Sequence, residues 1–179
     1  MLNAGMHDTY VAPHVHDRPR KLEVFVILRG SIAVVTFDPD GNLADCAVLI
    51  DKGPVRAAEI PAGTWHSFVV LTRSAVVYEL VDGRYDPRTH KHFARWAPDE
   101  CDTRRASVYL KGLRRQLSLA AKKQQGQNRS RIPKSDIESQ NTQRVWRVRS
   151  RMPTSPGSVL SFASVVNPIS VLGRIRVLD

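Results

Sequence analysis

Short apolar runs separated by turn residues fill the chain from residue 9 to residue 81, and none of them keeps a helical period for long. The clearest runs are LEVFVIL at 22–28 and SIAVVTF at 31–37, which are apolar at nearly every position. Gly30 stands between them and predicts a bend or a bulge. Strands at this short spacing are typical of a sandwich or a small barrel, so the pattern predicts an all-β fold.

Turn signals mark the ends of the runs. DPDG at 38–41 predicts a tight turn, because Pro favours its second position and Gly tolerates a left-handed one. Four further strands are expected, at CAVLI (46–50), VRAAEI (55–60), HSFVVL (66–71) and AVVYELV (75–81).

The pattern changes near residue 100. Apolar residues recur at spacings of three and four among the arginines and lysines of 104–123, which predicts a basic amphipathic helix. The stretch 123–143 is polar and favours disorder. The apolar positions of the expected helix are Ala106, Leu110, Leu113, Leu117 and Ala121. We therefore expect a β domain over 1–100, followed by a basic, partly helical or disordered tail over 101–179.

The charge divides at the same place. The net charge is +10, yet residues 1–100 hold 11 Lys and Arg against 13 Asp and Glu, whereas 101–179 hold 16 against 4. Such a tail could attach to nucleic acid or to an anionic membrane through residues 104–151. It carries neither a known RNA-binding signature nor interleaved aromatic residues, and a frame-shifted or fused coding sequence, the favoured interpretation, would look the same.

The two cysteines argue for a reducing compartment. Cys46 and Cys101 are far apart and form no CxxC motif, which argues against a disulfide framework or a zinc ribbon. The N-terminus has no signal-peptide pattern, and no apolar run reaches the length of a spanning helix. We expect a cytoplasmic protein without a transmembrane segment.

Two histidines precede the first long apolar run. His14 and His16 are separated by one residue, so on a strand both project to the same side. Glu23 shares a strand face with Phe25 and Ile27, where an ionised carboxylate is costly unless it is paired or bound to a cation.

His66 completes a candidate metal site. Pro61 and Gly63 predict a turn that delivers His66 to the start of a strand, in phase with Phe68. Three imidazoles and one carboxylate suit a divalent first-row transition ion such as iron, manganese, nickel, cobalt, copper or zinc. A lone histidine is more often hydrogen-bonded than a ligand, and HxH alone is a weak signal, so the prediction depends on the combination.

The combination resembles the two motifs of the cupin superfamily. HVH at 14–16, Glu23 and Gly30 match the first motif, and Pro61, Gly63 and His66 match the second. The chain departs from the motifs at outer positions only, which are Asp8, Val55 and Val70. The resemblance implies a double-stranded β-helix, or jelly-roll, barrel in which His14, His16, Glu23 and His66 bind the metal.

Residues 1–100 are also similar to the WbuC-type cupin-fold metalloproteins encoded among O-antigen and polysaccharide genes. The stretches EVFVILRGSIAVVTFDPDG, EIPAGTWHSFVVL, GRYDP and KHFARWAPDE carry this resemblance, with Arg84 in place of a proline. It implies a small, sugar-related ligand and a homodimer. Members of that family begin further upstream, so an N-terminal element is expected to be missing here.

Several side chains could surround a ligand, although aromatic residues on strands more often pack in a core. The candidate pocket residues are Phe25, Trp65, Phe68 and Tyr78. His7, His90 and His92 lie outside the motif spacing and are expected to be solvated, and Glu79 is expected at the surface rather than beside the metal as a base.

Three functions remain open at this point. The first is a metalloenzyme acting on a carbohydrate-related substrate, and the second is a ligand-binding cupin without catalysis, or a decayed copy. The third is attachment to nucleic acid or membrane through the tail. The sequence assigns no second catalytic pair. The resemblance does not choose among reactions, because cupins include isomerases, dioxygenases, decarboxylases and sensors alike.

Overall fold

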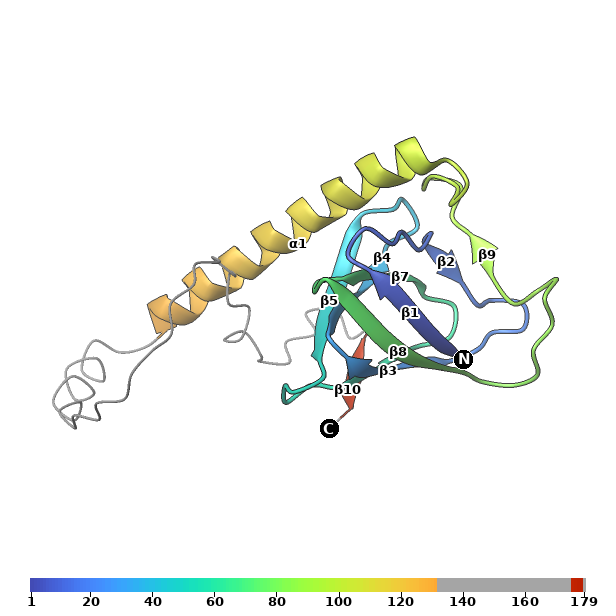
Figure 1. The fold of residues 1–179 in the computed structure, drawn as a ribbon, viewed down its shortest axis with the longest axis horizontal. Helices are drawn as coiled ribbons and strands as arrows, with labels where there is room; N and C mark the ends of the chain where they lie inside the picture. Colours follow the sequence, from blue (N-terminus) through green and yellow to red (C-terminus); the bar gives the residue numbers. More distant parts are fainter. Residues whose placement is uncertain (132–174, 179) are drawn as a thin grey trace, which may run out of the picture. The chain divides into compact units, whose positions relative to one another are not determined.

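The fold is a jelly roll of two antiparallel sheets. A computed structural model describes residues 1–131 and 175–178, with side chains through residue 123 and at 175–178. Its strands are β1 (Leu2–Met6), β2 (His14–Val15), β3 (Glu23–Arg29), β4 (Ser31–Phe37), β5 (Leu43–Ile50), β6 (Ala57–Ile60), β7 (Trp65–Val70), β8 (Ser74–Val81), β9 (His92–Phe93) and β10 (Arg176–Leu178). One sheet has the order β1-β8-β3-β6-β10 and the other β5-β4-β7-β2-β9 (Figure 1). The predicted all-β jelly roll is confirmed.

The long apolar runs are strands, as predicted. Most of the short strands were not predicted. β4 spans the predicted 31–37, and β3, β5, β6, β7 and β8 overlap the other expected runs. Sequence reasoning missed β1, β9 and β10 and gave no bounds for β2. These strands have five residues or fewer and are defined by pairing with neighbours, such as β1 with β8.

Gly30 bends the chain between the two sheets. It has φ +79°, and a Cβ there would collide with the carbonyl oxygen of Ser74. The register of β3 on β8 also shifts between Ile27 and Arg29, which is a β-bulge. The bend expected at this glycine is present, and it sends β4 into the second sheet.

The core lies between the sheets. It consists of inward-facing apolar side chains from both of them, including Phe25, Ile27, Ile32, Val34, Leu49, Ala58, Ile60, Phe68, Val70 and Val77. Alternate residues of β3 and β7 point into this core, so Glu23 and His66 share its inner face with Phe25 and Phe68.

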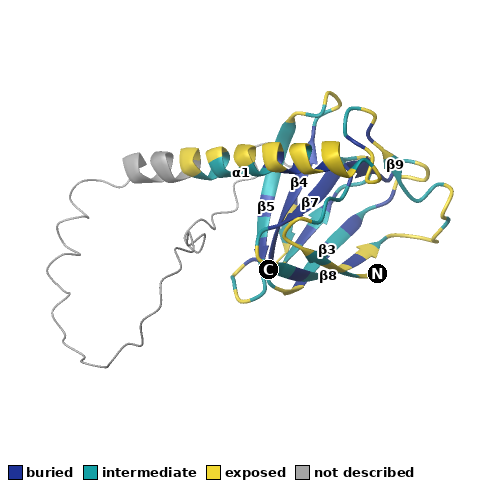
Figure 2. Ribbon diagram, turned by 45° about the horizontal axis from the view of Figure 1, so that its top comes forward, coloured by how far each residue is buried: buried dark blue, intermediate teal, exposed yellow. Residues whose placement is uncertain are grey.

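The helix α1 (Thr103–Arg131) explains why β4 is apolar on both faces. Leu110 and Leu113 pack against Val35 and Phe37, which point away from the inner core. Figure 2 shows the first turns of α1 beside the buried strands β4 and β7. Every residue of β4 is therefore buried.

A polar contact and an N-cap also support the start of α1. The Asp102 carboxylate accepts a hydrogen bond from the Arg105 amide at 3.0 Å, as an N-cap residue does. Arg114 donates to the carbonyl of Val70 at 2.8 Å and to that of His7. Residues 1–117 and 175–178 fall in one compact unit, so part of the predicted tail belongs with the barrel, and 118–131 fall in a second.

The helix continues to Arg131, so residues 123–131, which were expected to be disordered, are helical. The remainder of the expected disordered stretch, 132–143, lies outside the described residues. So do residues 132–151 of the segment proposed to attach to nucleic acid or membrane.

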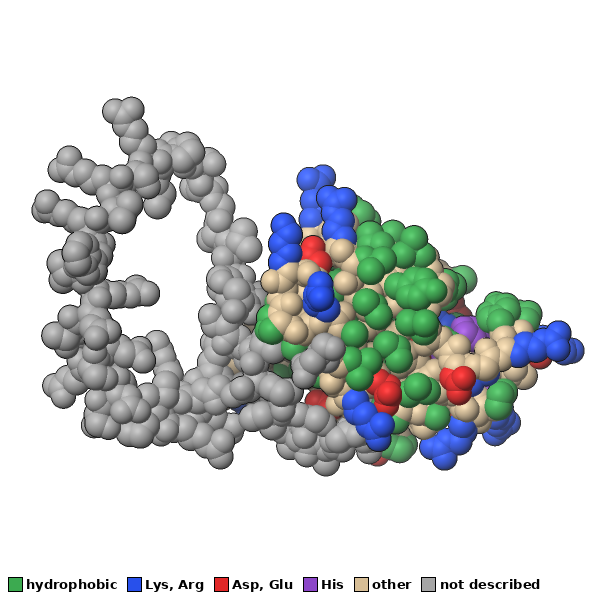
Figure 3. Space-filling model, turned by 90° about the horizontal axis from the view of Figure 1, so that it is seen from below, with side chains coloured by type: hydrophobic (Ala, Val, Ile, Leu, Met, Phe, Trp, Pro, Cys, Tyr) green, Lys and Arg blue, Asp and Glu red, His purple; other side chains and the backbone are tan. Residues whose placement is uncertain are grey.

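The outer face of the β1-β8-β3 sheet is apolar and exposed. Figure 3 views this side, where hydrophobic side chains gather. The exposed members on these strands are Leu2, Met6, Leu28, Tyr78 and Leu80. Within the described residues, no helix has the length and apolar character needed to cross a bilayer, and Cys46 and Cys101 are free thiols.

Candidate metal centre

Three histidines meet on the inner face of one sheet. β2 pairs with β7 so that His14 lies opposite His66, and their ring centroids are 4.4 Å apart. His16 follows two residues later, with its ring centroid 5.3 Å from that of His14 and 5.4 Å from that of His66. The predicted projection of His14 and His16 to one place is therefore what the structure has.

The carboxylate comes from the opposite sheet. Glu23 begins β3 and lies opposite Ile60 of β6. Its Oε2 is 3.0 Å from Nε2 of His16 and 2.6 Å from Nε2 of His66. All four side chains are buried, so the cluster joins the two sheets inside the barrel.

The Nδ1 atom of each of the three imidazole rings is hydrogen-bonded to a backbone carbonyl. His14 Nδ1 is 2.9 Å from the oxygen of Ala12, and His66 Nδ1 is 2.8 Å from that of Thr64. His16 Nδ1 bonds to the carbonyl of His90. A carbonyl only accepts hydrogen bonds, so each Nδ1 must donate, and the neutral ring then keeps a lone pair at Nε2.

The cluster leaves two buried polar atoms without a hydrogen-bond partner among the described residues. They are Nε2 of His14 and Oε1 of Glu23. Burial, reinforced by His66 and Lys91, holds the pKa of His14 well below its usual value, so its ring is neutral near pH 7. Two such buried atoms are costly unless something binds them.

The donor set fits a metal ion. One ligand atom from each of the four residues lies within 4.8 Å of the others. Ligand atoms at about 2.0 to 2.2 Å from an ion are at most about 4.4 Å apart, so closing on an ion takes movements of a few tenths of an ångström. Histidines that donate their other ring nitrogen to a carbonyl are also the usual form of histidine ligands.

The hydrogen bonds around Glu23 favour its ionised form. Burial alone would raise the pKa of Glu23, but its hydrogen bonds with His16 and His66 hold it well below its usual range. Because both rings donate at Nδ1, their Nε2 atoms can face the carboxylate only with a proton or a metal ion in between.

Two of the four candidate pocket residues lie beside the cluster. The ring of Phe25 is 6.2 Å from that of His66 and 5.8 Å from that of Phe68, centroid to centroid. Trp65 lies on the other face of β7, where it packs with Trp96 near α1. Tyr78 is 42% exposed on the outer face of β8. Neither Trp65 nor Tyr78 faces the cluster, because side chains alternate along a strand.

Three residues expected to be solvated are partly or fully buried. The His90 ring lies 4.9 Å from that of His16, and His92 pairs with Asp17. Glu79 is only 4% exposed. Burial, followed by the charge of Glu23, raises its pKa. The alternation of side chains along β8 could have predicted the burial of Glu79. Glu79 is two residues after the core residue Val77 and therefore shares its strand face.

Comparisons with known proteins give a short family match and distant structural likenesses. The family described as "Domain of unknown function (DUF6016)" matches residues 1–49. No curated protein matches the chain. NovW, a 4-keto-6-deoxy sugar epimerase from the novobiocin biosynthetic gene cluster of Streptomyces spheroides, is similar with 20% identity and a TM-score of 0.45, over 56% of this chain and 52% of that chain.

Two further solved structures are similar at the same level. The capsular polysaccharide assembling protein CapF of Staphylococcus aureus has 18% identity and a TM-score of 0.45, over 51% of this chain and 25% of CapF. The dTDP-4-dehydrorhamnose 3,5-epimerase of Elizabethkingia anophelis NUHP1 has 17% identity and a TM-score of 0.44, over 56% of this chain and 57% of that chain. The chain thus spans about half the length of the two epimerases and a quarter of CapF, and no activity carries over at this similarity.

Proposed function

We propose that the barrel binds one divalent first-row transition ion through His14, His16, Glu23 and His66. The observation that carries the proposal is the pair of orphaned atoms, Nε2 of His14 and Oε1 of Glu23, in a cluster whose Nδ1 atoms all have partners. An ion would bind the free Nε2 lone pairs and the carboxylate together.

A cluster stabilised by protons alone fits less well. Protonated His16 and His66 would each donate to Oε2 of Glu23, and the 2.6 Å contact of His66 is of that kind. His14 Nε2 and Glu23 Oε1 would still have no partner among the described residues. A metal ion would be a partner for both atoms, so we favour a metal ion over the protonated cluster.

The ligand of the site is proposed from the sequence resemblance, which points to a small sugar-related molecule of polysaccharide biosynthesis. A bound ion of this class polarises a carbonyl or activates water. The chain itself contributes the packing of Phe25 and Phe68 beside the ion and a second interior carboxylate, Glu79, for proton transfer. Catalysis requires Glu79 to transfer protons. If Glu79 does not, the barrel is a ligand-binding protein.

Metal analysis of purified protein tests the proposal. After incubation with Mn²⁺, Ni²⁺ or Zn²⁺ and gel filtration, we expect close to one equivalent per chain, and a small fraction of that in His66→Ala. His7→Ala, which removes an exposed histidine, serves as the matched control and should keep the metal. Equally low metal in all three proteins would overturn the proposal and favour a decayed copy.

We also propose, from the same resemblance, that the chain forms a homodimer. The exposed apolar face of the β1-β8-β3 sheet supports an interface, because large apolar patches are rare on monomers. Light scattering should give twice the chain mass, and Leu80→Lys should shift it to the monomer. A monomer in the unmodified protein would contradict this part of the proposal.

A further inference from the structure

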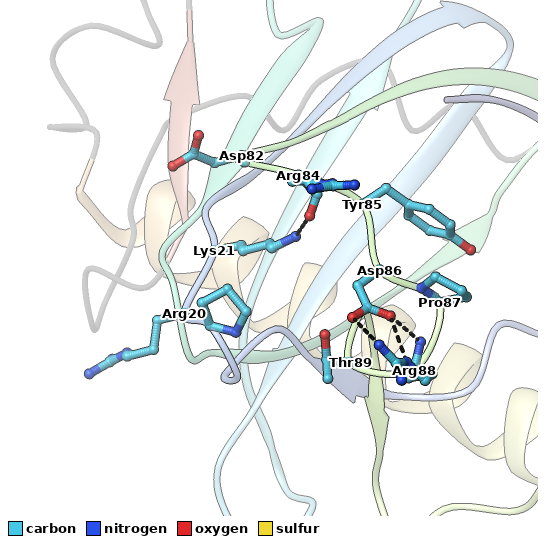
Figure 4. Close-up of a pocket in the computed structure, with 11 residues that line it drawn as sticks. Arg20, Lys21, Asp82, Arg84, Tyr85, Asp86, Pro87, Arg88 and Thr89 are labelled. Atoms are coloured by element: carbon cyan, nitrogen blue, oxygen red, sulfur yellow. Dashed lines mark hydrogen bonds and ion pairs between the residues drawn. The ribbon is translucent and has the colours of Figure 1, made fainter.

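The structure has a hollow of about 770 Å³ (Figure 4). It is lined by residues 19–21 and by the loop 82–89. The Tyr85 ring on its wall is 4.9 Å from the His90 ring, which is in turn 4.9 Å from the His16 ring, centroid to centroid. A hollow of this volume accommodates a small molecule.

The lining is basic. It contains four cationic and two anionic side chains, which are Arg20, Lys21, Arg84, Arg88, Asp82 and Asp86. In Figure 4, Arg20 extends away from the other cations, and it donates to the carbonyl of Ala62 at 2.9 Å. Arg88 pairs with Asp86 at 3.4 Å, but both are exposed, so an incoming anion can replace this weak pair.

Lys21 is the unusual member of the lining. It is only 6% exposed, and lysine is almost never buried without a counterion. Its ammonium group donates to the carbonyl of Arg84, and no described carboxylate pairs with it. The group has three donors, so a buried positive charge with spare donors lies at the wall of the hollow.

We propose that this hollow binds the phosphate group of a small molecule, with the Lys21 ammonium as anchor and the Arg84 and Arg88 guanidinium groups around it. A phosphate monoester carries about −1.5 to −2 charges, and Lys21, Arg84 and Arg88 offer it three cationic groups. Its oxygens accept from guanidinium and ammonium groups alike. A carboxylate has a single charge and two oxygens, so it would engage fewer of these three groups.

The rest of the ligand would lie against Tyr85. This ring is 65% exposed and forms one wall of the hollow, so its face is free to pack on an uncharged part of the molecule. That the same molecule reaches the metal centre rests on the proposed function. Phosphate binding in the hollow does not, because it uses none of the four proposed ligands.

Calorimetric titration of metal-free protein with inorganic phosphate tests the proposal. We expect saturable binding that weakens with added NaCl, at least tenfold weaker binding in Lys21→Met, and a clear loss in Arg88→Gln. Lys52→Met, which removes an exposed lysine outside the hollow, is the control and should bind phosphate normally. Acetate should bind much more weakly than phosphate.

The stability of the variant separates binding from a structural role. Removing a buried unpaired charge should leave the melting temperature of free Lys21→Met unchanged or higher, while its stabilisation by phosphate is lost. Phosphate binding that survives in both Lys21→Met and Arg88→Gln, or that acetate matches, would overturn the assignment. The exposed Arg88 provides the test if Lys21→Met does not fold.

The variant His66→Ala distinguishes failure of the phosphate proposal from failure of the metal proposal. We expect the variant to lose metal and to keep phosphate binding. Phosphate binding that disappears in His66→Ala but persists in Lys21→Met would place the anion at the histidine cluster and would contradict the hollow.

Discussion

His14 lies directly opposite His66 in the pairing of β2 with β7, although 52 positions separate them in the chain. The pairing brings their rings to 4.4 Å, centroid to centroid, with each Nδ1 held by a carbonyl two residues before it. The sheet itself therefore positions two of the four proposed ligands.

Glu23→Gln should abolish tight metal binding while leaving the barrel folded. The amide keeps the shape of the carboxylate but removes the only negative charge among the proposed ligands. We expect affinity for Zn²⁺ to fall by a factor of about 100 or more, on the scale of an ionised ligand lost from a buried site. Calorimetric titration beside His7→Ala would measure this, and unchanged affinity would exclude Glu23 as a ligand.

Metal-free protein should lose stability as the pH falls below about 6.5. The pKa of His14 is depressed in the folded state, so the unfolded chain takes up a proton there that the folded chain does not. At pH 5.5 this group alone costs on the order of 1 kcal/mol. Urea midpoints at pH 7.5 and 5.5 should fall more in the unmodified protein than in His14→Gln, and an equal or smaller fall would refute the assignment.

Gly63→Ala should disturb the turn that precedes His66. Gly63 has φ +79°, which costs an alanine about 1 to 2 kcal/mol. The new Cβ would also meet Nη2 of Arg20, the atom that donates to Ala62. We expect a lower urea midpoint and weaker metal binding.

Gly112→Ala is the matched control for that change. Nothing lies within 4 Å of a Cβ placed there, and the residue is in α1. Alanine is favoured over glycine in a helix by about 1 kcal/mol, so this variant should be more stable. Destabilisation of equal size in both variants would indicate that the backbone conformation of Gly63 has no special role.

Leu113→Ala tests whether α1 is part of the folded protein. Leu113 is buried against the β4 side of the barrel, and its truncation should cost about 2 to 4 kcal/mol. Val108, on the same helix, is 67% exposed, so Val108→Ala should change stability by less than about 0.5 kcal/mol. Chemical unfolding measures both, and equal small effects would show that the helix does not pack on the barrel.

The jelly roll could be predicted from the sequence because its central strands are long and buried on at least one face. Runs such as 31–37 carry enough apolar residues to identify a strand without knowing its neighbours. β1, with Asn3 and Gly5, has no such pattern, and it is a strand because it pairs with β8. Short edge strands depend on tertiary pairing that local sequence does not record.

The histidines and the glutamate could be identified because their spacing matches known motifs. The hollow could not, since residues 19–21 and 82–89 are brought together only by the fold. The burial of Lys21 has no local signature either, because lysine is ordinarily exposed. Trp65 and Tyr78 were misplaced because aromatic character does not indicate which face of a strand a residue occupies.

A crystal structure of metal-soaked protein, with anomalous data at the absorption edge of the metal, would show whether the four residues bind one ion. We expect one anomalous peak at about 2.0 to 2.3 Å from Nε2 of the three histidines and from a Glu23 oxygen. An anomalous map without a peak there, with the four side chains bonded only to one another or to water, would contradict it.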